Sequence, residues 1–248
     1  MKAMILAAGL GTRLRPLTDE RPKALVEVAG RTLLEVTLSR LRSFGVREVI
    51  INVHHFADMI LEYLKTNDNF GMRIEVSREE TLLDTGGGLK KAAHFFLENS
   101  KGSEAPFFLH NVDVISTIDL NQMLRFHVEN GALATLAVRD RSTSRYLLFD
   151  RQLRLCGRRS SHNRESELVR SSDQVQQLAF CGIHVISPQL LSLMKEEGAF
   201  SIVDAYLGLA ARGANILGFR ADEYYWRDLG SHAKLRQAAK DLPEQAVW

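Results

Sequence analysis

The chain has 248 residues and a formal net charge of +2, from 32 basic and 30 acidic side chains. A chain of this length can bury a sizeable core, and α/β folds of this size often form one unit, so we expect a single domain over residues 1–248. The near-balance of charge does not suggest binding to nucleic acid or to an anionic membrane, and no segment approaches the roughly 20 apolar residues of a membrane-spanning helix.

The first predicted element is a strand that ends in a glycine turn. Residues 2–8 are nearly all apolar, as in a central strand covered on both faces, and Gly9 stops the run. Gly9 and Gly11 allow a tight turn whose bare N–H groups can meet an anion. The dinucleotide fingerprint would need glycine where Leu14 stands, and no Walker A sequence follows. The stretch therefore predicts a different phosphate-binding loop, to which Thr12, Arg13, Arg15 and Lys23 add polar and cationic groups.

Alternating helical and strand patterns follow this loop. Apolar spacing predicts helices over residues 32–44 and 56–64, and strands over residues 48–53 and 72–76. The resulting βαβαβ order predicts a parallel sheet with right-handed crossovers.

A second glycine cluster lies in the segment EETLLDTGGGLKKA. Asp84 or Thr85 can cap a helix that begins around residues 86–88, where three glycines would let a flat ligand approach the backbone closely. A plain flexible helix start is the alternative.

The next apolar run, residues 106–110, predicts a further central strand that ends in Asn111-Val112-Asp113. A carboxylate at this end of a central strand lies on the ligand side of an open α/β sheet, so Asp113 is a candidate site residue. A helix over residues 118–130 and a strand over 132–138 come after it.

The character of the chain changes after residue 139. A polar insertion around residues 139–177 contains two short apolar segments, YLLF and LRLC, which suggest a hairpin. The remaining segments predict a strand over 177–186, a helix after Pro188, a helix over 200–211, a strand over 216–219 and a terminal helix through residue 241.

Cysteine usage points to a reducing compartment. Cys156 and Cys181 form no CxxC pair and have no His/Cys cluster beside them, which disfavours zinc. The first residues also lack the organisation of a signal peptide, so we expect a cytoplasmic protein.

The opening segment LAAGLGTRLRPLTDERPK resembles the LAAGxGTRLxPLT motif, with its following Pro-Lys, of the sugar-1-phosphate nucleotidylyltransferases. The resemblance implies a Rossmann-like α/β fold with a mixed, mostly parallel central sheet and helices on both faces. It also implies that Lys23 reaches the α-phosphate or the sugar phosphate. The residues it would place on the phosphates of a nucleoside triphosphate are Ala8, Gly9, Gly11, Thr12 and Arg13. A solvated basic loop is the alternative interpretation.

The same resemblance assigns roles to the later motifs. Asp113 and Asp228, the latter in a Trp-x-Asp-x-Gly-Ser segment, would bind Mg²⁺, although Val112 stands where the family has glycine. A β-branched residue tolerates a positive φ poorly, which puts the backbone before Asp113 in question. The residues implied at the nucleobase are Glu80, Gly86, Gly87 and Gly88, and those implied at the sugar are Asn111 and Gly182.

One family element is missing from the polar insertion. The Glu-Lys-Pro sequence that grips the sugar phosphate in the family is absent. Basic residues of the insertion can substitute for it, or can belong to a solvated loop: Arg158, Arg159, Arg164 and Arg170.

The implied activity is Mg²⁺-dependent transfer of a nucleotidyl group from a nucleoside triphosphate to a sugar-1-phosphate, with release of pyrophosphate. TLLDTGGG and the compact length look most like the N-acetylmuramate-1-phosphate uridylyltransferases of cell-wall recycling. Mannose- or heptose-1-phosphate guanylyltransferases, and a non-catalytic nucleotide-sugar-binding regulator, are the alternatives. The expected partners are these small molecules, and no sequence feature indicates an oligomeric state.

Overall fold

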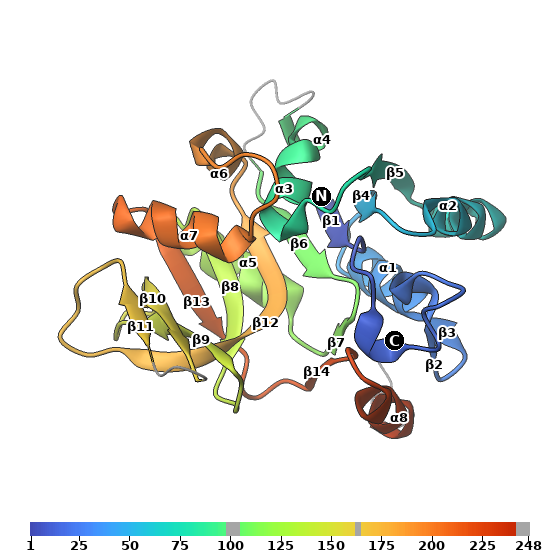
Figure 1. Ribbon diagram of the computed structural model, residues 1–248. Coiled ribbons are helices and arrows are strands. Elements are labelled where there is room, and N and C mark those ends of the chain that lie inside the picture. Colours follow the sequence, from blue (N-terminus) through green and yellow to red (C-terminus); the bar gives the residue numbers. More distant parts are fainter. Residues whose placement is uncertain (98–104, 162–164, 242–248) are drawn as a thin grey trace.

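The computed structural model describes residues 1–97, 105–161 and 165–241, and a ten-stranded sheet runs through the middle of this part of the chain (Figure 1). The strands of this sheet are β1 (Lys2–Leu6), β4 (Glu48–Val53), β5 (Arg73–Arg78), β6 (Phe107–Asn111), β8 (Ala134–Arg139), β9 (Arg145–Phe149), β10 (Leu155–Ser160), β11 (Ser166–Leu168), β12 (Gln176–Ile186) and β13 (Ile216–Arg220). Two short ladders join β2 (Glu27–Val28) to β3 (Arg31–Thr32), and β7 (Val114–Ser116) to β14 (Trp226–Asp228).

Helices cover the sheet on both sides. The α-helices are α1 (Leu33–Ser43), α2 (Ala57–Thr66), α3 (Asp84–Lys91), α4 (Ala93–Leu97), α5 (Leu120–Glu129), α6 (Gln189–Leu193), α7 (Ile202–Ala211) and α8 (His232–Asp241). Short 3-10 helices span Thr12–Leu14, Lys23–Leu25 and Asp68–Gly71. Among the described residues, no helix has the length and hydrophobicity needed to cross a bilayer.

The predicted parallel arrangement of the first strands is confirmed. β1 pairs in parallel with β4 on one side and β6 on the other, and β4 pairs in parallel with β5. β12 is antiparallel to both β6 and β8, and β8 is parallel to β13. The centre of the sheet is therefore mixed and mostly parallel, as predicted.

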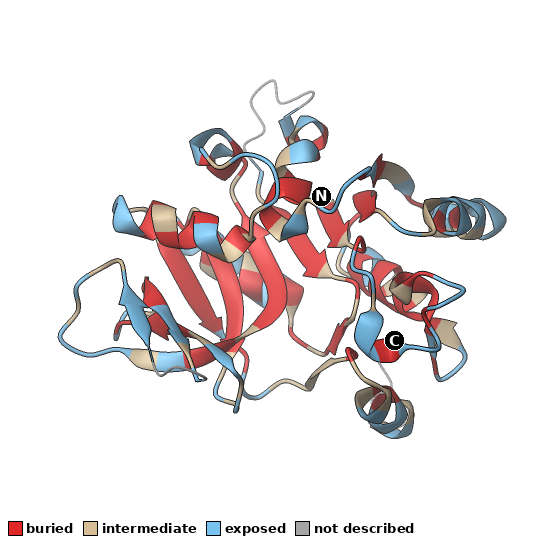
Figure 2. Ribbon diagram, viewed as in Figure 1, coloured by how far each residue is buried: buried red, intermediate tan, exposed pale blue. Residues whose placement is uncertain are grey.

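Two hydrophobic cores, one on each face, explain why the central strands are mostly apolar. Ile5 of β1 belongs to a cluster with side chains of α1, α2, α5 and α8, whereas its neighbour Met4 belongs to a cluster with α3, α4, α6 and α7. Neighbouring residues of a strand point to opposite faces, so a strand covered on both faces is apolar at most positions. Figure 2 shows these strands buried, and the helices around them with both buried and exposed residues.

The polar insertion extends the sheet beyond this two-sided core. β9 and β10 form the predicted hairpin, β11 adds to β10, and the first residues of β12 pair with β9. Figure 1 shows this extension at the opposite end of the sheet from β4 and β5.

The start of α3 differs from the prediction. Leu83 is the residue before the helix, and no side chain caps it. The Thr85 hydroxyl instead accepts a hydrogen bond from the Ile202 backbone N–H at 2.9 Å, which ties α3 to α7. Side-chain capping by Asp84 or Thr85 was therefore the wrong expectation: the Asp84 carboxylate accepts a hydrogen bond from the adjacent Thr85 N–H, and the Thr85 hydroxyl has a tertiary partner.

Close packing accounts for the three glycines of α3. A Cβ on Gly86 would overlap the Phe200 ring, and a Cβ on Gly87 would overlap the carbonyl oxygen of Gly198. A Cβ on Gly88 would lie 2.7 Å from the Asn52 amide nitrogen. These three glycines are buried and let α3 approach its neighbours closely.

We expect Gly87→Ala to lower the free energy of unfolding by about 3 kcal/mol, because a backbone carbonyl cannot move aside for the new methyl group. Gly9→Ala is the matched control: Gly9 has nothing within 4 Å of its Cβ position, so the change should stay within about 0.5 kcal/mol. Urea unfolding at equilibrium measures both. Equal stabilities of the two variants would contradict the packing role of Gly87.

Buried histidines make the stability depend on pH. Burial lowers the pKa of His110 and His127 to about 4 and that of His184 to about 3. In the unfolded chain a histidine titrates near pH 6.5, so below that pH the unfolded state binds more protons than the folded state. We therefore expect the free energy of unfolding to fall between pH 6.5 and 5, by up to about 1.4 kcal/mol per pH unit for each histidine. Urea midpoints that do not change between pH 7 and 5 would contradict this.

Candidate active site

A cavity of about 470 Å³ opens at the carboxyl ends of β1, β4, β5 and β6. The chain segments that follow these strands line it, and its wall includes five of the predicted site residues: Ala8, Gly9, Lys23, Asn111 and Asp113. This is the edge of an open α/β sheet at which ligands generally bind.

The glycine loop after β1 has the tight turn that the sequence predicts. Gly11 has φ +66°, and its carbonyl accepts a hydrogen bond from the Thr18 hydroxyl at 3.0 Å. A Cβ at Gly11 would also lie 2.9 Å from Thr18 Cγ2, so both its dihedral and its surroundings require glycine. Thr12 and Arg13 are exposed on this loop. An anion therefore has open access to these residues.

Lys23 and Asp113 form an ion pair at the floor of the cavity. Their side chains are only 12% and 20% exposed. Lys23 follows the buried Pro22 and starts a 3-10 turn, and Asp113 lies two residues after the end of β6. The two charges are thus held together by separate, well-packed elements.

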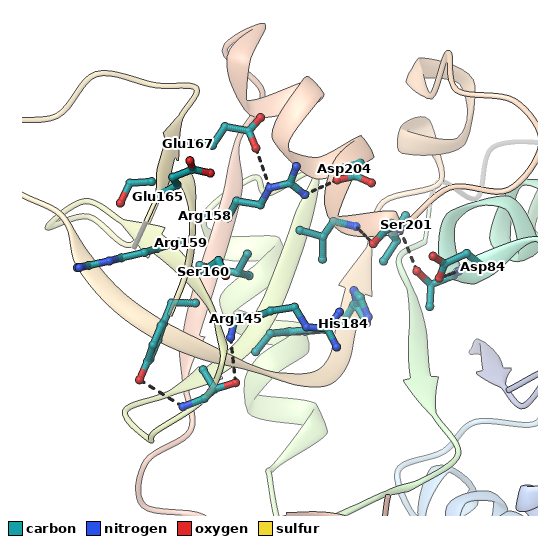
Figure 3. A pocket seen from close by; sticks show the side chains of 18 of the residues that line it. Asp84, Arg145, Arg158, Arg159, Ser160, Glu165, Glu167, His184, Ser201 and Asp204 are labelled. Atoms are coloured by element: carbon teal, nitrogen blue, oxygen red, sulfur yellow. Dashed lines mark hydrogen bonds and ion pairs between the residues drawn. The ribbon is translucent and has the colours of Figure 1, made fainter. Parts of the chain in front are cut away.

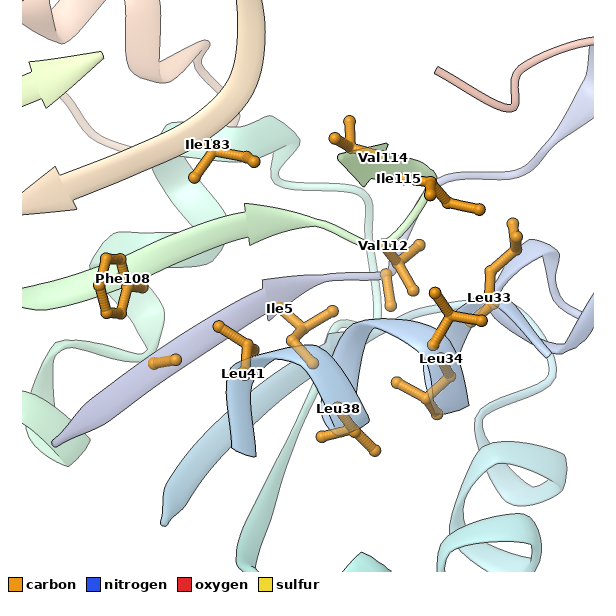
Figure 4. Packing of buried hydrophobic residues seen from close by; sticks show 14 of the residues in the cluster. Ile5, Leu33, Leu34, Leu38, Leu41, Phe108, Val112, Val114, Ile115 and Ile183 are labelled. Atoms are coloured by element: carbon orange, nitrogen blue, oxygen red, sulfur yellow. The ribbon is translucent and has the colours of Figure 1, made fainter. Parts of the chain in front are cut away.

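Val112 does not disturb the backbone before Asp113. Its φ is not positive, its N–H donates to the Leu6 carbonyl at 3.1 Å, and its carbonyl accepts from the Thr37 hydroxyl at 3.3 Å. Its side chain is buried in the cluster that contains Ile5 and Leu34 (Figure 4). The concern that this position needs glycine for its dihedral was therefore wrong.

The β7–β14 ladder brings Asp228 beside the Asp113 segment. Asp228 pairs with Val114, and the Leu229 N–H donates to the Asp113 carbonyl at 2.7 Å. The Asp228 carboxylate forms an ion pair with Lys234. Burial alone would raise the pKa of Asp228, but the hydrogen bond and charge of Lys234 lower it below its usual value. Asp228 is therefore ionised at neutral pH.

Arg13, on the glycine loop, lies near Asp228. A Cβ built on Gly230 would lie 2.8 Å from an Arg13 guanidinium nitrogen and 3.1 Å from an Asp228 carboxylate oxygen. Because Gly230 has no side chain, the Arg13 guanidinium and the Asp228 carboxylate can both lie close to its backbone. His232 also holds this loop, because its Nε2 lies 2.8 Å from the Arg15 carbonyl.

The donor set fits a hard divalent cation. Asp113 and Asp228 offer carboxylate oxygens from adjoining segments, and each is charge-balanced by a lysine. Within residues 1–97, 105–161 and 165–241, no group of three or more His, Cys, Asp or Glu side chains gathers at one point. Mg²⁺ usually takes one or two carboxylates and completes its octahedron with water and phosphate oxygens, so two aspartates suffice.

A buried acid that the sequence reasoning missed lies at the far end of this cavity. Glu79 is 4% exposed and lines the wall, whereas the predicted Glu80 is exposed and does not. Glu79 accepts hydrogen bonds from the Asn52 amide at 2.7 Å and the Leu83 N–H at 3.1 Å. Two signals were present in the sequence: Asn52 is a polar residue within an apolar strand, and inward-facing positions alternate from Ser77 to Glu79.

A second, larger cavity of about 1120 Å³ adjoins the first. The two share Asp84, Thr85 and Asn111 in their walls, and the hairpin β9–β10 and the start of α7 enclose the larger one. Figure 3 shows this cavity between the hairpin and α7. The two cavities therefore form one continuous cleft.

The space beside Gly182 is filled by the Asn111 side chain. The φ of Gly182 is +75°, and a Cβ there would lie 2.7 Å from the Asn111 amide nitrogen. Asn111 is thereby held between β6 and β12 at the junction of the two cavities.

The basic residues of the insertion have different environments. Arg158 and Arg159 line the larger cavity, whereas Arg170 donates to the Ala214 carbonyl at 2.8 Å and holds the end of α7. Arg164 lies outside the described residues.

Arg141 is a further cavity residue that the sequence reasoning did not single out. Its guanidinium lies 4.4 Å from the centre of the Trp226 ring and donates to the Phe180 carbonyl at 3.2 Å. It lines the larger cavity, and its charge adds to that of Lys234 in lowering the pKa of Asp228. Only the fold reveals this position, because Trp226 and Asp228 come from a distant segment.

Known proteins match the chain along most of its length. The family model described as Nucleotidyl transferase matches residues 2–245. The chain is 34% identical over 250 residues to the N-acetylmuramate alpha-1-phosphate uridylyltransferase of Caulobacter vibrioides, with 96% of each protein covered. It is 40% identical over 139 residues to the catalytic subunit beta of the Xenopus tropicalis mannose-1-phosphate guanylyltransferase, which covers 56% of this chain and 38% of that protein.

A solved structure of UDP-glucose pyrophosphorylase in complex with UDP-glucose has a TM-score of 0.79 to this chain, with 98% of each chain covered. At 17% identity this similarity bears on the fold alone. Because the family model spans almost the whole chain and the Caulobacter relative aligns from end to end, the chain belongs to the nucleotidyl transferase family and is a sugar-1-phosphate nucleotidylyltransferase.

Proposed function

We propose that the protein transfers the uridylyl group of UTP to N-acetylmuramate-1-phosphate in the presence of Mg²⁺, giving UDP-N-acetylmuramate and pyrophosphate. The observation that carries this proposal is the end-to-end similarity to the Caulobacter uridylyltransferase, since the guanylyltransferase similarity covers only 56% of the chain. Such a reaction supplies a nucleotide sugar for cell-wall synthesis and takes place in the cytoplasm. The two cysteines are free and buried, as a reducing compartment permits.

The shape of the cleft suits two substrates that meet at a phosphate. We place the nucleotide in the smaller cavity, with its base near Glu79 and the start of α3 and its phosphates on the loop of Gly9, Gly11, Thr12 and Arg13. The sugar occupies the larger cavity, and its ring lies beside Asn111.

The reaction needs no proton acceptor from the protein. The sugar phosphate is ionised at neutral pH, so its oxygen can attack the α-phosphorus while the bond to pyrophosphate breaks. When bound by Asp113 and Asp228, Mg²⁺ would neutralise the charge that gathers on the phosphates. Lys23 holds the α-phosphate and the incoming phosphate together, and Arg13 stabilises the departing pyrophosphate. Positioning and charge neutralisation therefore account for the catalysis.

We further propose that Arg141 substitutes for the missing Glu-Lys-Pro element and binds the phosphate of the sugar. Trp226 and the Phe180 carbonyl fix its guanidinium at the wall of the larger cavity, near Asp228. Arg141→Gln should raise the KM for the sugar phosphate about tenfold and leave the KM for UTP unchanged. Arg151→Gln, on an exposed turn of the same insertion, is the control that should change neither. An unchanged KM in Arg141→Gln would contradict the assignment.

A pyrophosphate-release screen tests the proposed function. Four nucleoside triphosphates are crossed with N-acetylmuramate-, N-acetylglucosamine-, mannose- and heptose-1-phosphate. We expect the highest kcat/KM for UTP with N-acetylmuramate-1-phosphate. A preference for GTP with mannose- or heptose-1-phosphate would support the guanylyltransferase alternative, and nucleotide-sugar binding without any pyrophosphate release would support a regulatory protein.

A further inference from the structure

The two strands of the insertion hairpin present different arginines on their two faces. In the β9–β10 ladder, Arg145 is opposite Ser160, Leu147 is opposite Arg158, and Tyr146 is opposite Arg159. Residues opposite each other share a face, and the face alternates along each strand. Arg145 and Arg158 therefore lie on one face of the hairpin, and Arg159 lies on the other.

The face of Arg145 and Arg158 is the one turned toward α7. Arg158 donates to the Asp204 carboxylate of α7 at 2.5 Å and to the Glu167 carboxylate at 2.7 Å. Figure 3 shows this bridge across the larger cavity, and shows Arg159 directed away from α7. The charge of Arg158 is thus balanced by two acids of the cavity wall.

The charge of Arg145 is not balanced by a carboxylate within the described part of the chain. Its side chain extends into the larger cavity toward His184 (Figure 3), and within the described part of the chain it forms no side-chain hydrogen bond or ion pair. His184 is buried and uncharged at neutral pH, because burial lowers its pKa to about 3. Glu165, another acid of the wall, makes an interaction of its own. The cavity therefore contains a cationic group that a ligand can neutralise.

Arg145 is also separated from the phosphate end of the cleft. Lys23 and Asp113 line the smaller cavity only, Arg145 lines the larger cavity only, and Asn111 lies at their junction. A sugar whose phosphate is at Lys23 and whose ring is beside Asn111 would direct its ring substituents toward the hairpin.

We propose that Arg145 binds a carboxylate substituent of the sugar ring and so selects acidic sugar-1-phosphates over neutral ones. The inference rests on the proposed function, and it adds the residue that determines specificity. A guanidinium fork matches a carboxylate with two parallel hydrogen bonds, which gives directional recognition as well as charge.

The test compares two acceptors that differ in one acidic group. N-acetylmuramate-1-phosphate carries a lactyl carboxylate that N-acetylglucosamine-1-phosphate lacks. We expect the unmodified enzyme to prefer the acidic sugar at least about tenfold in kcat/KM, and Arg145→Gln to lose this preference through a higher KM for the acidic sugar alone. Arg151→Gln, on an exposed turn of the same insertion and outside the walls of both cavities, should keep it.

Other outcomes would overturn the inference. An equal loss with both acceptors would place Arg145 on the shared phosphate, and no loss with either would remove it from the sugar site. Calorimetric binding of free N-acetylmuramate gives a readout that does not require turnover. If the enzyme releases no pyrophosphate with any acceptor but Arg145→Gln still abolishes this binding, the proposed function fails and the carboxylate site stands; if binding is unchanged in the variant, the carboxylate site fails.

Discussion

Asp113→Asn is expected to lower kcat by about a hundredfold or more while the protein stays folded. The substitution keeps the shape of the side chain but removes the negative charge that faces Lys23 and that would hold the metal. Initial rates of pyrophosphate release measure the effect, and titration of Mg²⁺ against the UTP complex should show weaker metal binding independently of turnover.

Asp58→Asn is the matched control for this prediction. Asp58 also forms an ion pair, with Arg78, but its side chain is 88% exposed and does not line either cavity. Its replacement should leave the rate and the Mg²⁺ affinity unchanged. Near-normal turnover and metal binding by Asp113→Asn would remove Asp113 from the metal site.

Lys23→Met is expected to have an effect of similar size, because it removes the cation that would hold the two reacting phosphates together. It also leaves the carboxylate of Asp113 without its partner. The two variants should therefore be non-additive: the double variant Lys23→Met/Asp113→Asn should be little slower than the slower single variant.

Single-turnover rates at saturating UTP test this coupling. Lys65→Met, a change of an exposed lysine on α2, serves as the control and should keep the normal rate. If the effects of Lys23→Met and Asp113→Asn multiply in the double variant, the two groups act independently and the account of the ion pair as one unit is wrong.

Much of the fold was predictable because the local patterns agree with the tertiary structure. The predicted strand over residues 48–53 coincides with β4, and the largely apolar runs correspond to strands that have a hydrophobic core on each face. The tight turn was predictable because Gly9 and Gly11 directly follow the apolar run, and the structure gives Gly11 a φ of +66°.

The parts that could not be predicted depend on contacts between distant segments. The sequence shows three glycines at positions 86–88 but not the Phe200 ring and the Gly198 carbonyl that fill the space beside them. The sequence likewise shows Val112 in place of glycine, but not that this backbone has an ordinary φ and that the valine side chain is needed in the core.

Two residues of the site could not be predicted because their positions depend on packing between distant segments. Glu79 and Glu80 are adjacent and chemically identical, and only the alternation at the end of β5 decides which of them is buried beside Asn52. Arg141 gains its place at the cavity from Trp226, which is 85 positions along the chain. Such pairings are set by the ladder register and by packing, neither of which is local.

The proposed activity moves a uridylyl group from UTP onto a sugar phosphate. Incubation of the purified protein with N-acetylmuramate-1-phosphate, Mg²⁺ and UTP labelled at the α-phosphate measures this transfer directly. We expect the label to appear in UDP-N-acetylmuramate, with one pyrophosphate released per labelled product. Chelation of Mg²⁺ should stop this transfer. Retention of the label in UTP when the sugar phosphate and Mg²⁺ are both present would contradict the proposed uridylyltransferase activity.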